Sequence, residues 1–265
     1  MKVKQNIISF LLGMAIMFPV GGYAVSEIIA KAVDVPVIVD GEQIDTTVYS
    51  VDGVYRASVR DIVEAMGGTT GLMLGEVRIE TAKTDTEKVA EACKDSCVMI
   101  YVYKGDTLKG NASGFVYNKH IITAKHVTDA GNRYVIFTDD EYYGVDATLV
   151  GIDTVLDLSV LAINADLPSV TLGDSDKLRE GQKVIAITSP SGVKNAIDEC
   201  LYHGVSYKDG KRNVDVSDSR MDSGSSGGAL FDTNGNLIGM VTRGYKSTHS
   251  AIPVNEIKAV LEQLN

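Results

Sequence analysis

Gly224-Ser225-Ser226-Gly227-Gly228-Ala229-Leu230 is the stretch of this 265-residue chain that says most about its fold. A serine nucleophile has to stand on a tight turn, because nearby backbone N–H groups must point at the oxygen that becomes negative. Glycine permits the unusual dihedral angles of such a turn and the close approach of a ligand. The stretch therefore suggests Ser226 as a nucleophile and the N–H groups of Gly224 and Ser226 as an oxyanion hole. Taken alone, it fits an ordinary Gly/Ser loop equally well.

Two segments upstream place a histidine and an aspartate in settings that suit partners of Ser226. They are Thr123-Ala124-Lys125-His126-Val127 and Asp157-Leu158-Ser159-Val160-Leu161. An imidazole that takes the proton of a serine hydroxyl activates it, and a carboxylate fixes the tautomer of that imidazole. A strand-like run can hold His126 at a cleft, and the apolar run after Asp157 can bury its carboxylate. Each residue alone would be unremarkable in a core or on a surface, but the three settings together predict a catalytic triad.

From residue 98 onward the apolar pattern has a period of two, which is typical of β-strands. Many short strands separated by turn signals predict a sandwich or a barrel. An amphipathic helix follows, and its apolar positions are Val254, Ile257, Val260, Leu261 and Leu264. The predicted strands are 98–103, 113–116, 121–124, 134–137, 147–150, 158–162, 183–187, 214–216, 229–231, 237–241 and 250–252.

These motifs, with Ser113-Gly114-Phe115-Val116, Gly235-Asn236-Leu237-Ile238-Gly239-Met240 and Ala251-Ile252-Pro253, resemble the trypsin-like peptidases. The bacterial HtrA-type protease domain is the branch that they resemble most. The resemblance covers residues 98–265. It implies a mainly β fold, in which two antiparallel six-stranded β-barrels of the chymotrypsin-like kind are followed by a C-terminal helix, with the active site between the barrels.

The same resemblance implies an activity and assigns roles to residues. The chain would be a serine endopeptidase that hydrolyses peptide bonds of polypeptide substrates through an acyl-enzyme. His126 would be the general base, Asp157 would orient it, and Ser226 would be the nucleophile. The N–H groups of Gly224 and Ser226 would hold the oxyanion. Thr242-Arg243-Gly244 would be the strand edge that pairs with the substrate backbone.

The chain departs from the family pattern in three ways. Ser225 stands where the family usually has Asn or Asp, so activation by an internal ion pair with a newly cut N-terminus would lack its partner. Ala229 replaces a common proline, which is a mild change. No PDZ domain follows the last helix, so we expect no regulation of the HtrA kind through such a domain.

The sequence indicates substrate preference only weakly. Arg220 lies six residues before Ser226, which places it near the primary specificity pocket if the loop aligns without gaps. Arg243 and His249 are further candidates for the neighbourhood of this pocket. Cationic groups there would favour acidic substrate side chains. The alternative is that both arginines point to solvent, which is the usual position of a charged side chain and the preferred interpretation.

Residues 35–80 predict a separate small α+β domain. Strands are expected at 35–39 and 48–51, a helix at 59–66 with Ser58 as its N-cap, and a closing strand near 77–79. The unit resembles the stalk-like N-terminal domain of copper amine oxidases through Asp52-Gly53-Val54-Tyr55, Val59-Arg60 and Ala65-Met66-Gly67. That domain does not carry the copper chemistry, so the resemblance implies a spacer or attachment role, including contact with the cell envelope. Residues 81–97 predict a linker helix.

Residues 1–30 are typical of an export segment. Lys2 and Lys4 precede an apolar run at 7–20, and Gly22-Tyr23-Ala24 offers a cleavage site. The run is short for a membrane span, so a cleaved signal peptide and an uncleaved signal anchor both stay open. The rest of the chain is expected outside the cell, either extracellular or anchored to the outer face of the bacterial cytoplasmic membrane, with membrane contact only through this segment.

Composition limits the partners and cofactors. A net charge of −10 argues against a nucleic-acid partner, and four scattered histidines show no metal-ligand spacing, so neither a metal nor another cofactor is expected. Cys93 and Cys97 could form a local disulfide beside a free Cys200, or all three could be buried thiols. The alternatives to the peptidase are a catalytically silent binding module of the same fold and an envelope scaffold in which residues 35–80 carry the function.

Overall fold

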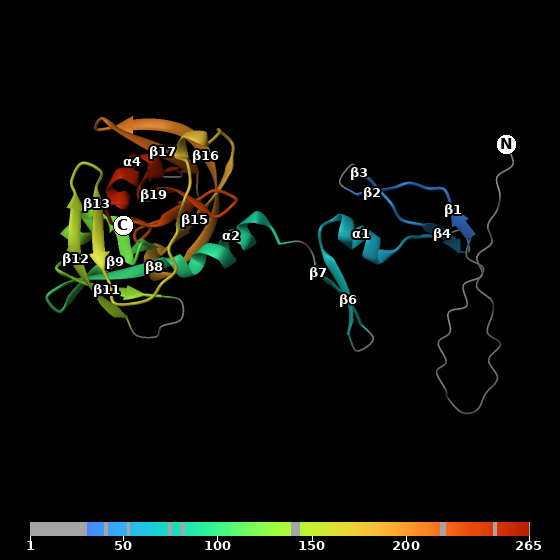
Figure 1. The fold of residues 1–265 in the computed structure, drawn as a ribbon, viewed down its shortest axis with the longest axis horizontal. Coiled ribbons are helices and arrows are strands. Elements are labelled where there is room, and N and C mark those ends of the chain that lie inside the picture. The colour runs from blue at the N-terminus through green and yellow to red at the C-terminus, as the bar shows by residue number, and fades with distance from the viewer. Residues whose placement is uncertain are drawn as a thin grey trace, which may run out of the picture. The chain divides into compact units, whose positions relative to one another are not determined.

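A computed structural model describes residues 31–39, 42–51, 54–73, 76–80, 83–138, 144–217, 221–245 and 248–264. The predictions for residues 1–30, for parts of the turns at 40–41 and 52–53, and for Arg220 lie outside these residues. The chain divides into two compact units, Met1–Lys83 and Thr84–Asn265 (Figure 1). In the described part of the chain, no helix is long and apolar enough to cross a membrane.

In its described residues, the first unit contains small sheets and one helix. Strands β1, β4 and β5 form an antiparallel sheet, while β2–β3 and β6–β7 are hairpins. Helix α1 begins after Ser58, whose hydroxyl accepts a hydrogen bond from the backbone N–H of Asp61 at 3.2 Å, and it buries Val63. The elements are β1 (Lys31–Val33), β2 (Val37–Val39), β3 (Glu42–Ile44), β4 (Val48–Val51), β5 (Val54–Arg56), α1 (Val59–Ala65), β6 (Thr69–Met73) and β7 (Glu76–Glu80).

Helix α2 (Asp85–Cys93) opens the second unit. A capping box fixes its start, because the hydroxyl of Thr84 accepts from the N–H of Glu87 and the Glu87 carboxylate accepts from the N–H of Thr84. Its apolar face packs on β15 (Lys183–Thr188) and β16 (Ala196–Lys208), where Val89 and Cys93 are buried. The segment predicted as a linker helix thus includes a helix that is part of the second unit.

The first barrel of the second unit is closed and antiparallel, with strand order β10-β13-β12-β11-β8-β9 (Figure 1). A short helix, α3 (Lys125–Asp129), leaves the end of β10. Alternate side chains of the strands fill the interior, as the period of two requires. The strands are β8 (Cys97–Lys104), β9 (Thr107–Tyr117), β10 (His120–Ala124), β11 (Arg133–Phe137), β12 (Val145–Asp153) and β13 (Leu158–Ala162).

The second barrel is closed by a pairing between β19 and β20, which completes the antiparallel order β19-β18-β15-β16-β17-β20. Strand β14 adds in parallel to β19, and α4 packs on β19 and β20. One apolar cluster includes inward residues of both barrels, such as Phe115 and Phe231. The elements are β14 (Thr171–Leu172), β15 (Lys183–Thr188), β16 (Ala196–Lys208), β17 (Lys211–Ser217), β18 (Ala229–Phe231), β19 (Asn236–Tyr245), β20 (Thr248–Pro253) and α4 (Val254–Leu261).

The predicted fold class is confirmed: the chain is mainly β, with two six-stranded antiparallel barrels and a C-terminal helix. The sequence pattern does not reveal β16, although it is a long strand. Its inward residues include Asp198, while Leu201 faces outward, so the sequence does not show the expected alternation. The two-residue strand β14 is too short to show any period.

Candidate active site

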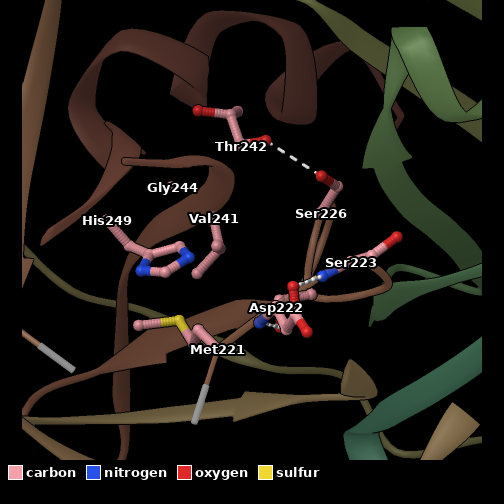
Figure 2. Close-up of a pocket in the computed structure, with 9 residues that line it drawn as sticks. Met221, Asp222, Ser223, Ser226, Val241, Thr242, Gly244 and His249 are labelled. Atoms are coloured by element: carbon pink, nitrogen blue, oxygen red, sulfur yellow. Dashed lines mark hydrogen bonds between the residues drawn. The ribbon is translucent and has the colours of Figure 1, made fainter. Parts of the chain in front are cut away.

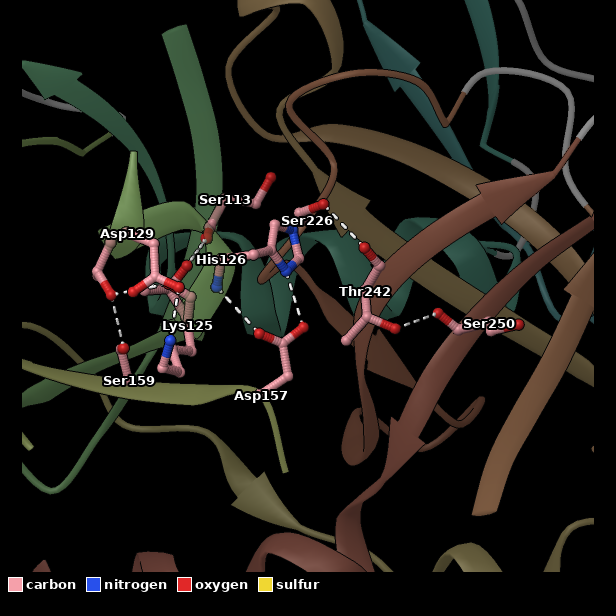
Figure 3. A network of polar contacts seen from close by, with 11 residues as sticks. Ser113, Lys125, His126, Asp129, Asp157, Ser159, Ser226, Thr242 and Ser250 are labelled. Carbon is pink, nitrogen blue, oxygen red and sulfur yellow. Dashed lines mark hydrogen bonds and ion pairs between the residues drawn. The ribbon is translucent and has the colours of Figure 1, made fainter. Parts of the chain in front are cut away.

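His126 and Asp157 meet where two paired strands of the first barrel end. Ala124 at the end of β10 lies opposite Leu158 at the start of β13, so the residues that flank these ends are neighbours. His126 Nδ1 lies 2.8 Å from Asp157 Oδ2, and the backbone N–H of His126 donates to Asp157 Oδ1 at 2.9 Å (Figure 3). Both carboxylate oxygens therefore hold the histidine, one through its ring and one through its backbone.

Asp157 has a left-handed backbone conformation, with φ of +56°. Such a conformation is costly for a residue other than glycine and persists where surrounding contacts enforce it. Here the carbonyl of Asp157 accepts from the N–H of Lys125 at 2.8 Å, in addition to the two bonds to His126. The strained residue is thus locked against the turn that carries the imidazole.

Ser226 stands on the loop that precedes β18, and it lines a cavity of about 270 Å³ together with His126 and Gly224. Figure 3 shows the imidazole of His126 between Ser226 and Asp157. The Ser226 hydroxyl donates to the carbonyl of Thr242 at 2.9 Å. The structure therefore brings Ser226 and His126 to one cavity, with Asp157 bonded to the imidazole and the hydroxyl of Ser226 turned toward Thr242.

Two glycines of this loop adopt conformations that other residues avoid. Gly224 has φ of +102° and Gly227 has φ of +84°. A Cβ at Gly224 would overlap the Asn111 side chain and lie 2.5 Å from the Ser189 carbonyl oxygen. One at Gly227 would overlap the hydroxyl of Thr123 and a backbone oxygen of β9. Only glycine fits either position without movement of the neighbours.

The peptide between Ser223 and Gly224 has a fixed orientation. Its carbonyl accepts a hydrogen bond from the backbone N–H of Ser191 at 2.7 Å. Since the peptide is trans, the N–H of Gly224 points the opposite way, away from Ser191. Gly224 and Ser226 both line the cavity that contains His126, which is the arrangement that two oxyanion donors would need.

The loop is held from the first barrel by Ser113 of β9, a residue to which the sequence motifs assign no role of its own. The Ser113 hydroxyl donates to the carbonyl of Gly224 at 2.7 Å and accepts from the N–H of Ser189 at 2.7 Å. The Ser113 N–H donates to the carbonyl of Ser226 at 2.9 Å. One buried serine thus ties together three segments of the site. The detectable signal was a polar residue at a buried strand position among apolar neighbours.

Ser225, at the position where the family usually has Asn or Asp, is buried under the loop. Its hydroxyl donates to the Thr188 hydroxyl at 3.2 Å and accepts from the N–H of Asp222 at 3.1 Å. The N–H of Ser225 in turn donates to the carbonyl of Asp222 at 2.9 Å. This serine stabilises the turn with neutral hydrogen bonds.

The predicted substrate-binding residues Thr242, Arg243 and Gly244 lie on β19, beside the cavity that contains Ser226. Thr242 and Gly244 line both a cavity of about 250 Å³ that includes Ser226 and a groove of about 310 Å³ that includes Asp157. Arg243 pairs through its backbone with Ser250 of β20, and its side chain is not among those described. His249 is buried and lines the cavity beside Ser226.

The remaining predictions concern metals and cysteines. Among the described residues, no three metal-ligating side chains lie close enough together to hold an ion. Cys93, Cys97 and Cys200 are buried thiols. Burial raises the pKa of the Cys93 thiol to about 11, and this thiol donates to the carbonyl of Gly235 at 3.4 Å. A protonated, buried thiol is a poor nucleophile, so Cys93 is a packing residue.

Comparison with known proteins agrees with this geometry. Residues 112–240 match the family described as trypsin-like peptidase domain. A probable periplasmic serine endoprotease DegP-like of Halomonas elongata is 34% identical over 165 residues, which cover 57% of this chain and 34% of the relative. The serine protease Do-like HtrA of Bacillus subtilis is 28% identical over 228 residues, which cover 78% of this chain and 47% of the relative. The chain thus spans between a third and a half of these relatives.

A solved structure shows the same fold. The active form of the Rv3671c protease from M. tuberculosis superimposes with a TM-score of 0.60 at 20% identity, covering 67% of this chain and 84% of the other. The resemblance of residues 35–80 to the copper amine oxidase stalk stays a prediction. The barrels, the turn that carries Ser226 and the sequence match agree: the second unit has the chymotrypsin fold, and residues 112–240 of it match the trypsin-like peptidase domain.

Proposed function

We propose that this chain is an exported serine endopeptidase in which His126, Asp157 and Ser226 form the catalytic triad. The observation that carries the proposal is that His126, whose ring is hydrogen-bonded to Asp157, lines the same cavity as Ser226 and Gly224. The names of the relatives, serine endoprotease and serine protease, support the reaction class. The substrate is a polypeptide.

The reaction starts with proton transfer from Ser226 to His126. Ser226 Oγ attacks the carbonyl carbon of the scissile peptide bond while His126 Nε2 takes the hydroxyl proton. Asp157 accepts the Nδ1–H of the imidazole, stays ionised and stabilises the imidazolium. The carbonyl oxygen becomes an oxyanion, which the N–H groups of Gly224 and Ser226 stabilise by about 3 kcal/mol each.

Collapse of this intermediate breaks the C–N bond. The leaving amine takes the proton from His126, and the acyl group stays on Ser226 as an ester. A water molecule then attacks the ester carbonyl while His126 takes one of its protons. The second collapse returns that proton to Ser226 and releases the carboxylic acid product, so the enzyme is regenerated with one water consumed.

Ser226 has to turn before it reacts. Its hydroxyl donates to the Thr242 carbonyl at 2.9 Å, and rotation about the Cα–Cβ bond would direct the hydroxyl to His126. Hydrogen bonds of a catalytic site are often long or misdirected without substrate and tighten in the complex. The rotation would free the Thr242 carbonyl, which is on the edge proposed to pair with the substrate backbone.

The substrate would lie along the segment from Thr242 to Gly244. Thr242 and Gly244 line two hollows, the cavity beside Ser226 and the groove beside Asp157. An extended peptide that pairs with this segment would direct alternate side chains into the cavity and the groove. Arg243 and Arg220 stay candidates for contact with the substrate, because the structure describes the side chain of neither.

Export rests on the leader-like residues 1–30 and on relatives that are named periplasmic. We place the protease domain on the outer side of the bacterial cytoplasmic membrane, either released or held by the N-terminal segment. The first unit would then act as a spacer or as a contact with the cell envelope.

A fluorophosphonate probe tests the proposal on the purified full chain. The probe forms a covalent bond with an activated serine, so we expect rapid labelling of the wild type and no labelling of Ser226→Ala. His126→Ala should fold like the wild type and label at a rate lower by several orders of magnitude. If the folded wild type is not labelled, the peptidase assignment is wrong and the silent binding module or envelope scaffold takes its place.

A further inference from the structure

The imidazole of His249 forms one wall of the cavity beside Ser226. His249 lies on β20 directly opposite Gly244 of β19, and its side chain is 7% exposed. A Cβ at Gly244 would overlap Nε2 of this imidazole, so the ring occupies the space that a side chain at position 244 would take. Figure 2 shows the ring directed into the cavity, across from Ser226 and Ser223 and above Met221.

The other described residues around the cavity are neutral, with one exception. Met221 and Val241 supply its apolar part, and hydroxyl groups of serine and threonine supply most of its polar part. Thr242 already donates its hydroxyl hydrogen to the carbonyl of Ser250 at 3.2 Å. Among the described lining side chains, His249 is the one that can become a cation, and Asp222 is the one that can become an anion.

Two carboxylates in the described part of this region, those of Asp222 and Asp215, have hydrogen-bond partners of their own. Asp222 is exposed, and its Oδ1 accepts from the N–H of Ser223 at 2.7 Å. Asp215 of β17 accepts from the Ser250 hydroxyl at 2.7 Å; the strand register pairs Val216 with His249, so alternation puts Asp215 on the opposite face of the sheet. On β19 the neighbouring charged residue is Arg243, whose side chain is not described.

We propose that His249 makes this cavity selective for an acidic side chain, glutamate or aspartate, on the residue whose carbonyl Ser226 attacks. The inference rests on the proposed peptidase function. The cavity lies between Ser226 and the edge at Thr242 and Gly244, so the side chain that enters it belongs to the residue bound at that edge. An imidazolium at the wall donates a charge-assisted hydrogen bond to the carboxylate.

Fluorogenic peptides that differ only in this residue test the proposal on the full-length protein. We would measure kcat/KM for peptides with Glu, Gln or Val before the scissile bond, at about pH 6. The Glu-to-Gln ratio is the readout, because the catalytic triad acts on both peptides equally and its contribution cancels. Glutamate in a peptide is ionised at this pH. The expected ratio is about tenfold or more.

Two variants with opposite effects locate the selectivity. His249→Gln keeps a hydrogen-bond donor but cannot carry a charge, so it should lower the Glu-to-Gln ratio at about pH 6 by about tenfold. Asp222→Asn keeps an oxygen for the Ser223 N–H and removes a negative charge from the cavity lining. It should raise the Glu-to-Gln ratio by about two- to threefold.

Fluorophosphonate labelling separates failure of this inference from failure of the proposed function, because the probe reports on Ser226 and needs no acidic side chain. A labelled wild type that cleaves the Gln or Val peptide as well as the Glu peptide would overturn the acidic preference and leave the peptidase intact. A labelled His249→Gln variant with an unchanged ratio would overturn the role of His249. An unlabelled, folded wild type would overturn the peptidase itself and the inference with it.

Discussion

The two barrels of the second unit hold their parts of the site by different means. The first barrel presents His126 and Asp157 at the ends of paired strands, and side-chain hydrogen bonds join them directly. The second barrel presents Ser226 on a loop whose shape depends on backbone conformation, with positive φ angles at Gly224 and Gly227. One half of the site is set by strand register, and the other by the dihedral angles of a turn.

This difference has a consequence for assembly. The base and its orienting carboxylate need only the first barrel, because both flank strands of that barrel. The nucleophile loop needs both barrels, since Ser113 of the first barrel bonds to the carbonyls of Gly224 and Ser226. We therefore expect the oxyanion donors to reach their final positions only when the barrels have packed together.

Asp157→Asn should have the largest effect. It disrupts only the half of the site that the first barrel carries, the pair of His126 and Asp157. The asparagine Oδ1 can still accept from the N–H of His126, which turns the amide NH₂ toward Nδ1. The imidazole then has to carry its proton on Nε2 and cannot accept one from Ser226. We expect kcat to fall about 10⁴-fold with little change in KM. Steady-state kinetics at neutral pH measure this, and a loss below tenfold would show that the pair does not govern the proton transfer.

Gly224→Ala disrupts only the half of the site that the second barrel carries, the loop with Ser226 and the oxyanion donors. The added Cβ would overlap the Asn111 side chain, and φ of +102° is strained for alanine, so the loop must shift and one oxyanion donor with it. The expected loss in kcat is about 10²- to 10³-fold. Gly181→Ala is the matched control, because φ there is +80° and no atom lies within 4 Å of the added Cβ. That control should lose stability alone; an equal loss of kcat in it would contradict the oxyanion role of Gly224.

The contrast between the halves also explains what the sequence could predict. His126, Asp157 and Ser226 each carry a local setting, a strand end or a Gly/Ser turn, that is visible in a few consecutive residues. Ser113 is visible in the sequence only as a polar residue in an apolar strand; the partner of its hydroxyl is not, because Gly224 is 111 residues away. Contacts of this kind are decided by how the barrels pack, and a single sequence does not show that.

The same limit applies to the fold. Strands with apolar inner faces were predictable from their period, whereas β16 has a buried Asp198 and an exposed Leu201 that conceal it. The apolar face of α2, with Val89 and Cys93, predicted a helix but not the strands, β15 and β16, on which it packs. Periodicity shows which face of a helix or strand is buried. The tertiary structure determines which other element that face packs against.

Ser113→Ala tests the link between the halves and should have a moderate effect. It removes a buried hydrogen bond to the Gly224 carbonyl and leaves the Ser189 N–H without its acceptor. Since the oxyanion donors matter in the transition state, kcat should fall about tenfold while KM stays the same. Ser175→Ala is the control, a buried serine whose hydroxyl accepts from the N–H of Asn255. If both variants lose only stability, Ser113 is a structural residue and does not position the loop.

Thr84→Ala should have the smallest effect and shows whether loss of stability alone can imitate the others. Thr84 caps α2, which packs on β15 and β16 of the second barrel, so its loss should lower the free energy of unfolding by about 1 kcal/mol. Thr84→Ser keeps the capping hydroxyl and should restore it. Because neither half of the site contacts this cap, kcat should not change. A parallel fall of kcat and stability in Thr84→Ala would mean that the nucleophile loop follows the stability of its whole barrel, and the separation of the halves would not hold.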